Sequence, residues 1–267
     1  MARNYRIRFM DNNLAAVHTP ILAPSETSLK PFSNCFTDSR SQVWESTGLV
    51  ETITYDFTYQ RPVGYIALIG PHEQEFGLTP AATVTIEGNN IDDWATPPFS
   101  QEIPVTDDGA MAFLDTDAGL PEYRYWRIVI DDSTSPASSI SIGTMYLGDY
   151  KALTQRNVQA GFSRTNTDPA KTFKSEDGAL FFDQKTKYLE FTGVSLGFLD
   201  PIDKADLELI FGEFGISKPL FVSFDPTLKV SSDIHELTRY MLFRDRPFFQ
   251  HIKESIYTMN LQLREHV

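Results

Sequence analysis

A short segment centred on Ser195 has the residue pattern of a nucleophilic serine. Residues 193–197 read Gly-Val-Ser-Leu-Gly, which fits the G-x-S-x-G turn that exposes the serine of many hydrolases. The residues that would complete the order Ser, Asp, His follow it: Asp225 or Asp233, then His235 or His251. Such a turn requires a helix that begins at the serine, whereas here apolar alternation continues through Phe198 and the expected helix begins at Pro201. We therefore predict a strand with a glycine bulge at this position, and no enzymatic activity.

The histidines and one acidic turn are the residues that could bind a metal ion. The five histidines lack the close H-E-x-x-H spacing of zinc enzymes, so the sequence carries no signal for a zinc site. Asp115 and Asp117 begin like a calcium loop, because alternate carboxylates in a turn can share one hard cation, but the later oxygen ligands are missing. We favour a solvated acidic turn there, leave calcium binding open, and predict no cofactor.

A tryptophan in an acidic loop is a candidate for binding. Asp92 and Asp93 precede Trp94, and two prolines follow within four residues, which places the tryptophan in a loop. An indole ring flanked by carboxylates can stack on a sugar ring while the acids bind its hydroxyl groups. The alternative, which we favour from the sequence, is that Trp94 closes one end of the core. The adjacent carboxylates at 92–93, 107–108 and 131–132 are predicted to keep loops soluble, because neighbours in an extended chain point apart.

Composition excludes several classes of protein. The 267 residues are enough for one large or two small domains, and the single cysteine, Cys35, has no disulfide partner in the chain. The net charge of −13 argues against general binding of nucleic acid or of an anionic membrane surface. No apolar run approaches the roughly 20 residues needed to cross a bilayer, and polar residues after Met10 interrupt any signal peptide. We expect a soluble, folded protein.

The acidic charge is concentrated in the first half of the chain. Residues 1–150 contain 8 Lys and Arg against 20 Asp and Glu, whereas residues 151–267 contain 15 against 16. This change falls in a polar stretch, so we predict two domains with these bounds.

The first domain has the pattern of a sandwich of short strands. Period-2 alternation predicts half-buried strands at 53–59 and 82–86, and a continuous apolar run predicts a strand buried on both faces at 63–69. Further strands, rich in aromatic and β-branched residues, are predicted at 123–130 and at 140–147, with Trp126 packed either in the core or between the domains. Because no helical period is found in this half, the expected fold is a β-sandwich or jelly roll.

The second domain is expected to contain strands and one packed helix. Strands are predicted at 188–198, with a bulge at Gly193, at 220–224 and at 257–263. A helix is predicted over 201–214. The residues that indicate it are the cap Asp200, Pro201 at the first position, the apolar stripe of Leu207, Ile210, Phe211 and Phe214, and Gly215 at the end.

Six segments of the first domain, taken together, resemble a known family. Their order and spacing look like the galactose-binding-like, discoidin-type jelly roll, in the version found in tail proteins of bacteriophages. The resemblance covers about residues 35 to 150 and rests on residues 44–47, 53–57, 67–70, 85–88, 125–130 and 142–148. The family often carries a His-Asn pair after the third of these segments, where this chain has His72 and Glu73.

Residues 155–267 are similar in layout to the β-sandwich of phage tail-tube and distal-tail proteins, which assembles as rings. The two resemblances imply a non-enzymatic component of a phage tail tip or baseplate, assembled in the host cytoplasm and located in the virion. They also imply a ring formed by the C-terminal domain, an outward N-terminal domain, contacts with tube, hub and fibre proteins, and neither sequence-specific nucleic-acid nor membrane binding. The alternative is a carbohydrate-binding adhesion protein, and a serine hydrolase is a third. Five residues are the candidates for carbohydrate or partner binding: His72, Glu73, Asp92, Asp93 and Trp94.

Overall fold

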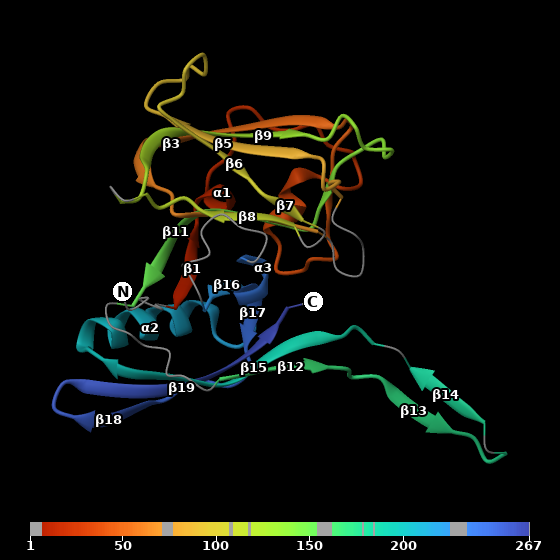
Figure 1. Cartoon of the computed structure of the whole chain (residues 1–267), viewed down its shortest axis with the longest axis vertical. Helices are drawn as coiled ribbons and strands as arrows, with labels where there is room; N and C mark the ends of the chain where they lie inside the picture. Colours follow the sequence, from red (N-terminus) through yellow and green to blue (C-terminus); the bar gives the residue numbers. More distant parts are fainter. Residues whose placement is uncertain are drawn as a thin grey trace. The chain divides into compact units, whose positions relative to one another are not determined.

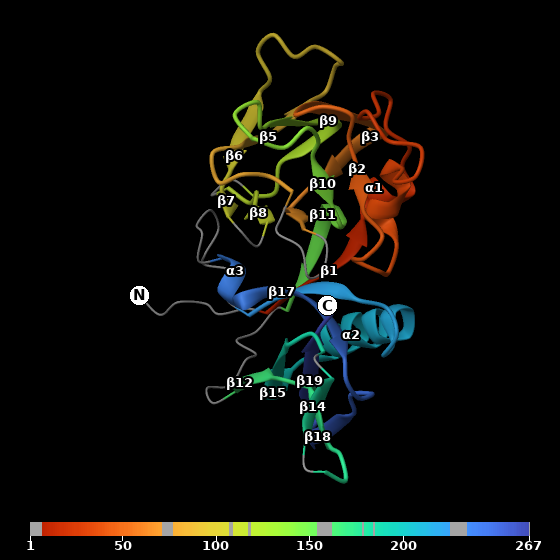
Figure 2. The ribbon, with the colours of Figure 1, turned by 90° about the vertical axis from the view of Figure 1, so that its right-hand side faces the viewer.

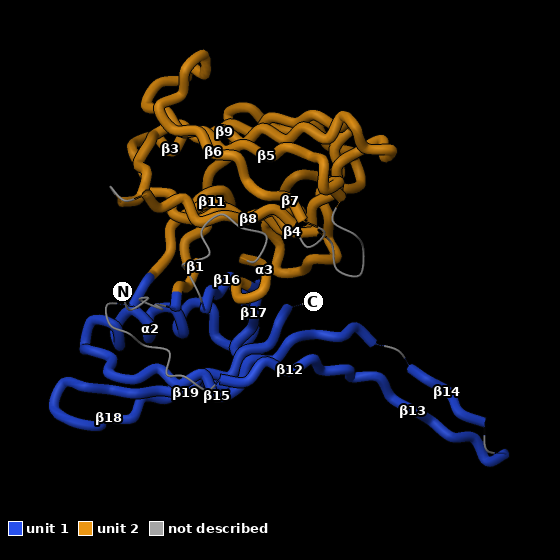
Figure 3. The backbone as a smooth tube through the Cα atoms, in the orientation of Figure 1, with its two compact units in different colours: residues 1–7, 152–224, 239–267 blue, residues 8–151, 225–238 orange. Residues whose placement is uncertain are grey.

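The computed structural model divides the chain into two compact units (Figure 3). Unit 1 contains residues 1–7, 152–224 and 239–267, and unit 2 contains residues 8–151 and 225–238. The structure describes residues 7–70, 77–106, 109–116, 119–153, 162–177, 179–183, 185–224 and 234–266. The break after Lys151 lies next to the boundary predicted at residue 150, while each unit also takes a segment from the other half of the chain.

Unit 2 is a β-sandwich of two main sheets that lie face to face (Figure 1). The first sheet has the order β3 (Val50–Pro62), β9 (Glu122–Asp131), β5 (Thr83–Asn89) and β6 (Phe99–Ile103), all paired antiparallel. The strands of the second sheet are, in order, β1 (Arg8–Asn13), β11 (Thr144–Ala152), β4 (Tyr65–Ile69), β8 (Gly109–Phe113) and β7 (Val105–Thr106). A small separate sheet pairs β2 (Trp44–Glu45) with β10 (Ser141–Ile142).

The core of unit 2 follows the predicted alternation. Inward residues of β3, β5 and β9 pack with residues of β4 and β8, and their side chains are fully buried: Ile53, Tyr55, Phe57, Val84, Ile86, Trp126, Ile128, Ile130, Ile66, Leu68, Ala110 and Ala112. Every residue of β4 is buried, as the continuous apolar run predicts. The prediction was wrong at Tyr59, which is exposed, because Thr58 has φ +70° and a register shift after Asp56 ends the alternation.

Some short elements of unit 2 carry no pattern that predicts them. Helix α1 (Leu14–Val17), the 3-10 helix η1 (Phe32–Phe36) and helix α3 (Ile234–Leu237) are single turns, and a single turn cannot display a 3.6-residue period. The strand expected over 140–147 is split into β10 and β11 at Gly143.

Unit 1 has a sheet with a helix packed on it. The strands run in the order β12 (Ser163–Thr167), β15 (Tyr188–Leu199), β19 (Ile256–Glu265), β17 (Thr238–Phe243) and β16 (Leu220–Ser223), and β18 (Phe249–Lys253) also pairs with β19. Helix α2 (Pro201–Phe214) packs on β15 and β19 (Figure 1 and Figure 2). No helix among the described residues is long and apolar enough to cross a membrane. The all-β fold class is confirmed, with α2 as the one helix of several turns among the described residues. The tube-like β-sandwich expected for residues 151–267 is not confirmed, because the described part of unit 1 has one main sheet, covered by α2, and the separate pair β13–β14.

The predicted helix is confirmed with both of its ends, while its apolar stripe is confirmed only in part, because Phe211 and Phe214 are partly exposed. The Asp200 carboxylate accepts hydrogen bonds from the backbone N–H groups of Ile202 and Asp203 at 2.8 Å. Leu207 and Ile210 are buried, and the helix ends at Gly215 with φ +55°.

Strand β15 contains two bulges, of which one was predicted. Gly193 has φ +70° where the pairing with β19 shifts between Phe191 and Val194. A second shift after Leu196 gives Phe198 a φ of +57° and exposes it, so the prediction of an inward Phe198 was wrong and Leu199 is buried instead. No glycine marks this bulge in the sequence.

The close approach of β1 and β11 leads to a testable prediction. A Cβ atom at Gly148 would lie 1.9 Å from the carbonyl oxygen of Asn12, and this backbone oxygen cannot move without breaking the strand contact. We expect Gly148→Ala to lower the free energy of unfolding by about 1–3 kcal/mol, as overpacking does, measured by urea denaturation. At Gly48 nothing lies within 4 Å, so Gly48→Ala should change stability by less than about 0.5 kcal/mol. Equal effects of the two substitutions would contradict the close approach of Gly148 to the Asn12 carbonyl oxygen.

Candidate functional site

The acidic loop between β5 and β6 is held in shape by its own hydrogen bonds. The side-chain oxygen of Asn89 accepts from the backbone N–H of Asn90 at 2.7 Å, and its amide nitrogen donates to the carbonyl of Asp93 at 2.5 Å. The Asp93 carboxylate in turn accepts from the backbone N–H of Ala95 at 3.0 Å. The loop therefore presents its next side chains from a fixed backbone.

Trp94 lies on the outside of the first sheet. Its Nε1 donates to the Asp92 carboxylate at 2.8 Å, and the Arg127 guanidinium carbon lies 4.5 Å from its ring centroid. Arg127 is held by Glu87, whose carboxylate accepts from Nε at 2.6 Å, because the two residues are directly paired across β9 and β5. We call these five residues the loop platform: Glu87, Asp92, Asp93, Trp94 and Arg127.

Trp94 is not a core residue, so the interpretation favoured from the sequence was wrong. Its side chain is only partly buried and is not among the residues of the core cluster of unit 2. The cation of Arg127 packs against the indole ring outside the sheet, so the ring is partly buried without entering the core. Of the two positions predicted for Trp126, the structure shows the core, since that ring is fully buried in the core cluster of unit 2.

A second arginine on the same face fixes an ionised carboxylate. Arg124 donates to both oxygens of Asp56 at 2.7 Å, and these hydrogen bonds lower the pKa of Asp56 to about 2. The backbone N–H of Arg124 also donates to the Asn90 side chain at 3.3 Å, which connects this pair to the acidic loop. The face beside the loop platform therefore keeps its charges at neutral pH.

The loop platform combines an aromatic ring with exposed carboxylates. Asp92 and Asp93 are both exposed on the loop, next to the indole ring. An aromatic face packs against the C–H groups of a sugar ring, and carboxylates accept hydrogen bonds from its hydroxyl groups. The platform is suited to binding a polyhydroxylated molecule at the surface.

Comparison with known proteins found similarity only among solved structures. No protein-family model matches the sequence, and no curated protein matches it. A fucose-binding module of Streptococcus pneumoniae is 11% identical with a TM-score of 0.40, and covers 52% of this chain and 99% of the module. A family 32 carbohydrate-binding module of C. perfringens, in complex with galactose, is 13% identical with a TM-score of 0.40, and covers 54% and 99%. A chitosan-binding module from Paenibacillus is 17% identical with a TM-score of 0.36, and covers 52% and 99%. Similarity at this level assigns no ligand to this chain, and nothing in it supports the resemblance to phage tail proteins.

The other predicted binding residues, His72 and Glu73, lie outside the residues that the structure describes. The sequence analysis missed Arg127 and Glu87, although one signal for them was present. Arg127 stands between the apolar residues Trp126 and Ile128, and Glu87 follows the apolar Ile86, so a charged residue interrupts each of the two strands. Pairing them requires the register of β5 on β9, which the sequence does not provide.

The candidate nucleophiles lie in structural positions. Ser195 is part of β15 and pairs with Asn260 of β19, as expected for a continuing strand. His235 lies in α3 of unit 2 and is buried, the ring of His251 stacks on Tyr257 at 5.1 Å, and Asp225 and Asp233 lie outside the described residues. Burial raises the pKa of the Cys35 thiol, which disfavours the reactive thiolate.

The acidic turn at Asp115 has a different role from the one predicted. Asp115 accepts from Arg8 at 3.1 Å, and its side chain is only 14% exposed, so it is not a solvated acid. The Arg8 guanidinium also lies 4.4 Å from the ring centroid of Phe113 and 4.1 Å from that of Tyr150. Asp117 lies outside the described residues, among which no group of three acidic, His or Cys side chains could hold a metal ion.

Asp132 also departs from the prediction that adjacent acids keep loops soluble. It is buried and accepts from the backbone N–H of Thr79 at 2.9 Å and from the Thr79 hydroxyl at 2.5 Å. This carboxylate joins two loops of unit 2 instead of facing water.

Proposed function

We propose that unit 2 is a non-catalytic carbohydrate-binding domain and that the sugar lies on the loop platform. The observation that carries this proposal is Trp94, a partly exposed indole ring stacked on Arg127 with two carboxylates beside it. The other two tryptophans, Trp44 and Trp126, are fully buried and have no access to a ligand.

The platform is arranged to bind with little ordering of its own. The hydrogen bonds of Asn89 and Asp93 fix the loop, and Glu87 fixes Arg127 beneath the ring. A preorganised surface loses less conformational entropy on binding, which leaves more of the interaction energy for affinity. The ring would contact the apolar face of the sugar, and Asp93 would accept from a hydroxyl group.

Tryptophan fluorescence tests the proposal in the full chain. Because Trp44 and Trp126 are buried, a change of emission on titration with galactose, fucose or a chitosan oligomer reports mainly on Trp94. We expect at least one of these sugars to change the emission. In calorimetry, Trp94→Ala should raise its Kd at least about tenfold, which corresponds to about 1.4 kcal/mol.

A matched control lies on the same sheet. Tyr59 is exposed and stacks on Arg61 with 4.0 Å between the guanidinium carbon and the ring centroid, which resembles the arrangement of Trp94 on Arg127. Tyr59→Ala should leave the Kd unchanged. Absence of binding across a broad glycan array, or equal binding by the Trp94→Ala variant, would refute the proposal.

A second function, a structural role in a phage tail tip or baseplate, is favoured by a hairpin of unit 1. Strands β13 (Lys171–Lys174) and β14 (Leu180–Asp183) form a separate two-stranded sheet in which every residue is exposed (Figure 1). Large exposed apolar side chains on such a sheet are typical of a surface buried in an assembly.

In this proposal the C-terminal domain, with its nearly balanced charge, forms a homo-oligomeric ring in the virion, and the acidic N-terminal domain is displayed outward. Mass measurement in solution with negative-stain imaging tests it, because a monomer at all concentrations would exclude a ring.

A further inference from the structure

The hairpin of β13 and β14 is apolar on both of its faces. Phe173 and Phe181 are paired directly across the two strands, so they share one face, while Leu180 and Phe182 lie on the other. These four side chains are 55% to 66% exposed. We call the described residues 171–177 and 179–183 the arm.

The arm lacks the contacts that usually stabilise a hairpin. A two-stranded sheet is marginally stable in water, and it needs a further strand or a packed surface on one face. The exposure of the four side chains shows that the described residues of unit 1 provide no such surface for them. The arm therefore has the properties of an element that another molecule covers.

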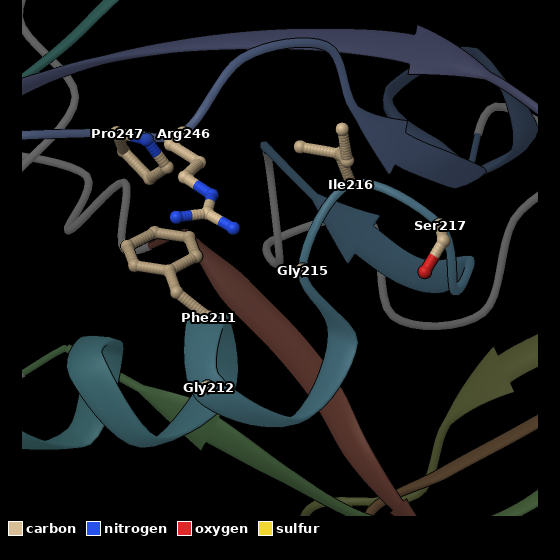
Figure 4. Close-up of a pocket in the computed structure, with 7 residues that line it drawn as sticks. All are labelled: Phe211, Gly212, Gly215, Ile216, Ser217, Arg246 and Pro247. Carbon is tan, nitrogen blue, oxygen red and sulfur yellow. The ribbon is translucent and has the colours of Figure 1, made fainter.

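Unit 1 also contains a cleft whose lining could receive an apolar and acidic segment. The cleft has a volume of about 480 Å³ and lies between the end of α2 and the loop after β17, lined by Phe211, Gly215, Ile216, Arg246 and Pro247 (Figure 4). Phe211 and Arg246, from α2 and from the loop after β17, both line this cleft (Figure 4). Arg246 is exposed, and within the described part of the chain no carboxylate pairs with it.

We propose that the arm of one copy of this chain docks into this cleft on a second copy. At the tip of the arm, Glu176 and Asp177 are exposed acids that complement the charge of Arg246. Directly beyond the tip, Leu180 on one face of the arm and Phe181 on the other supply apolar surface that matches Phe211, Ile216 and Pro247 around the cleft. This inference rests on the self-assembly proposed above and names the surfaces that perform it.

The arm and the cleft share no residue, so one copy can use both at once. Such a contact is heterologous: the arm of each copy enters the next copy, and the series either closes as a ring or continues as a filament. The proposed contact includes ion pairing of Arg246 with the acids at the tip of the arm, so the association should weaken as salt concentration rises.

Complementation between two variants of the full chain tests this arrangement. The arm variant carries Leu180→Asp and Phe181→Asp, and the cleft variant carries Arg246→Glu. We expect the wild type to form species larger than a dimer by light scattering coupled to size exclusion, and each variant alone to have the monomer mass of 30.2 kDa. An equimolar mixture should form a one-to-one dimer, because the intact arm of the cleft variant enters the intact cleft of the arm variant.

The controls separate this inference from the proposal of self-assembly. Leu29, in unit 2, is the most exposed of the large apolar residues described, at 89%, so Leu29→Glu should leave the oligomer unchanged. Circular dichroism should show that all variants are folded, since the substituted side chains are exposed. A monomeric wild type would overturn both self-assembly and the arm contact. An oligomeric arm variant would overturn the arm contact alone, and a mixture that stays monomeric would overturn the docking of the arm into the cleft.

Discussion

Replacing Trp126 by alanine is expected to lower the free energy of unfolding by about 3–5 kcal/mol. The indole ring is fully buried between the two sheets of unit 2. Its centroid lies 5.6 Å from that of Phe99 and 5.7 Å from that of Tyr123, both in edge-to-face geometry. Its Nε1 donates to the Tyr123 carbonyl at 3.1 Å. Alanine would leave a cavity and remove the partner of that carbonyl.

Denaturation followed by fluorescence measures this effect. All three tryptophans belong to unit 2, so Trp44 still reports its unfolding in the variant. Trp94→Ala is the matched control and should cost less than about 1 kcal/mol, because an exposed cation–π contact is worth only about 0.5–1 kcal/mol. If the two substitutions cost the same, the placement of one ring in the core and the other on the surface is wrong.

The contrast between these two tryptophans shows what the sequence can predict. Trp126 begins the segment 126–130, in which every second residue is apolar, and this local period determines which face is buried. Trp94 lies in a loop with no period, so its position depends on Arg127, which is distant in sequence and is brought near by the pairing of β9 with β5. Local patterns therefore predict burial within a strand but not the stacking of a loop residue on a neighbouring strand.

Backbone irregularities limit the prediction in the same way. The bulge at Gly193 could be predicted because glycine readily adopts a positive φ. Thr58 and Phe198 also have positive φ values, although neither residue type favours them, and both lie where the pairing register shifts. The exposure of Tyr59 and Phe198 follows from these shifts, so it could not be derived from alternation alone.

The candidate site was only partly accessible to sequence reasoning. Asp92, Asp93 and Trp94 are adjacent, so their gathering on one loop is visible in the sequence. Glu87 and Arg127 complete the platform from two strands, and their meeting requires the three-dimensional register. The arm was also missed, because its strands contain too few residues for alternation to be distinguished from chance.

Replacing Leu207 in helix α2 of unit 1 is the second substitution with a large expected effect on stability. Leu207 is fully buried at the centre of α2, which packs on β15 and β19, and Phe211, one turn later, meets Phe243 of β17 with 4.7 Å between ring centroids. We expect Leu207→Ala to lower the free energy of unfolding by about 2–5 kcal/mol, since it removes buried methyl groups and leaves a cavity. Circular dichroism during urea denaturation of the full chain measures the loss.

Leu209 provides a control in the same helix, with the same residue type and the same loss of side-chain atoms. It is 72% exposed, so Leu209→Ala should change the free energy of unfolding by less than about 0.5 kcal/mol. Alanine has a slightly higher helix propensity than leucine, so both variants keep the helix itself intact. The difference between them therefore isolates the packing of α2 on its sheet, and a difference of less than about 1 kcal/mol would mean that the stripe of α2 does not form the core of unit 1.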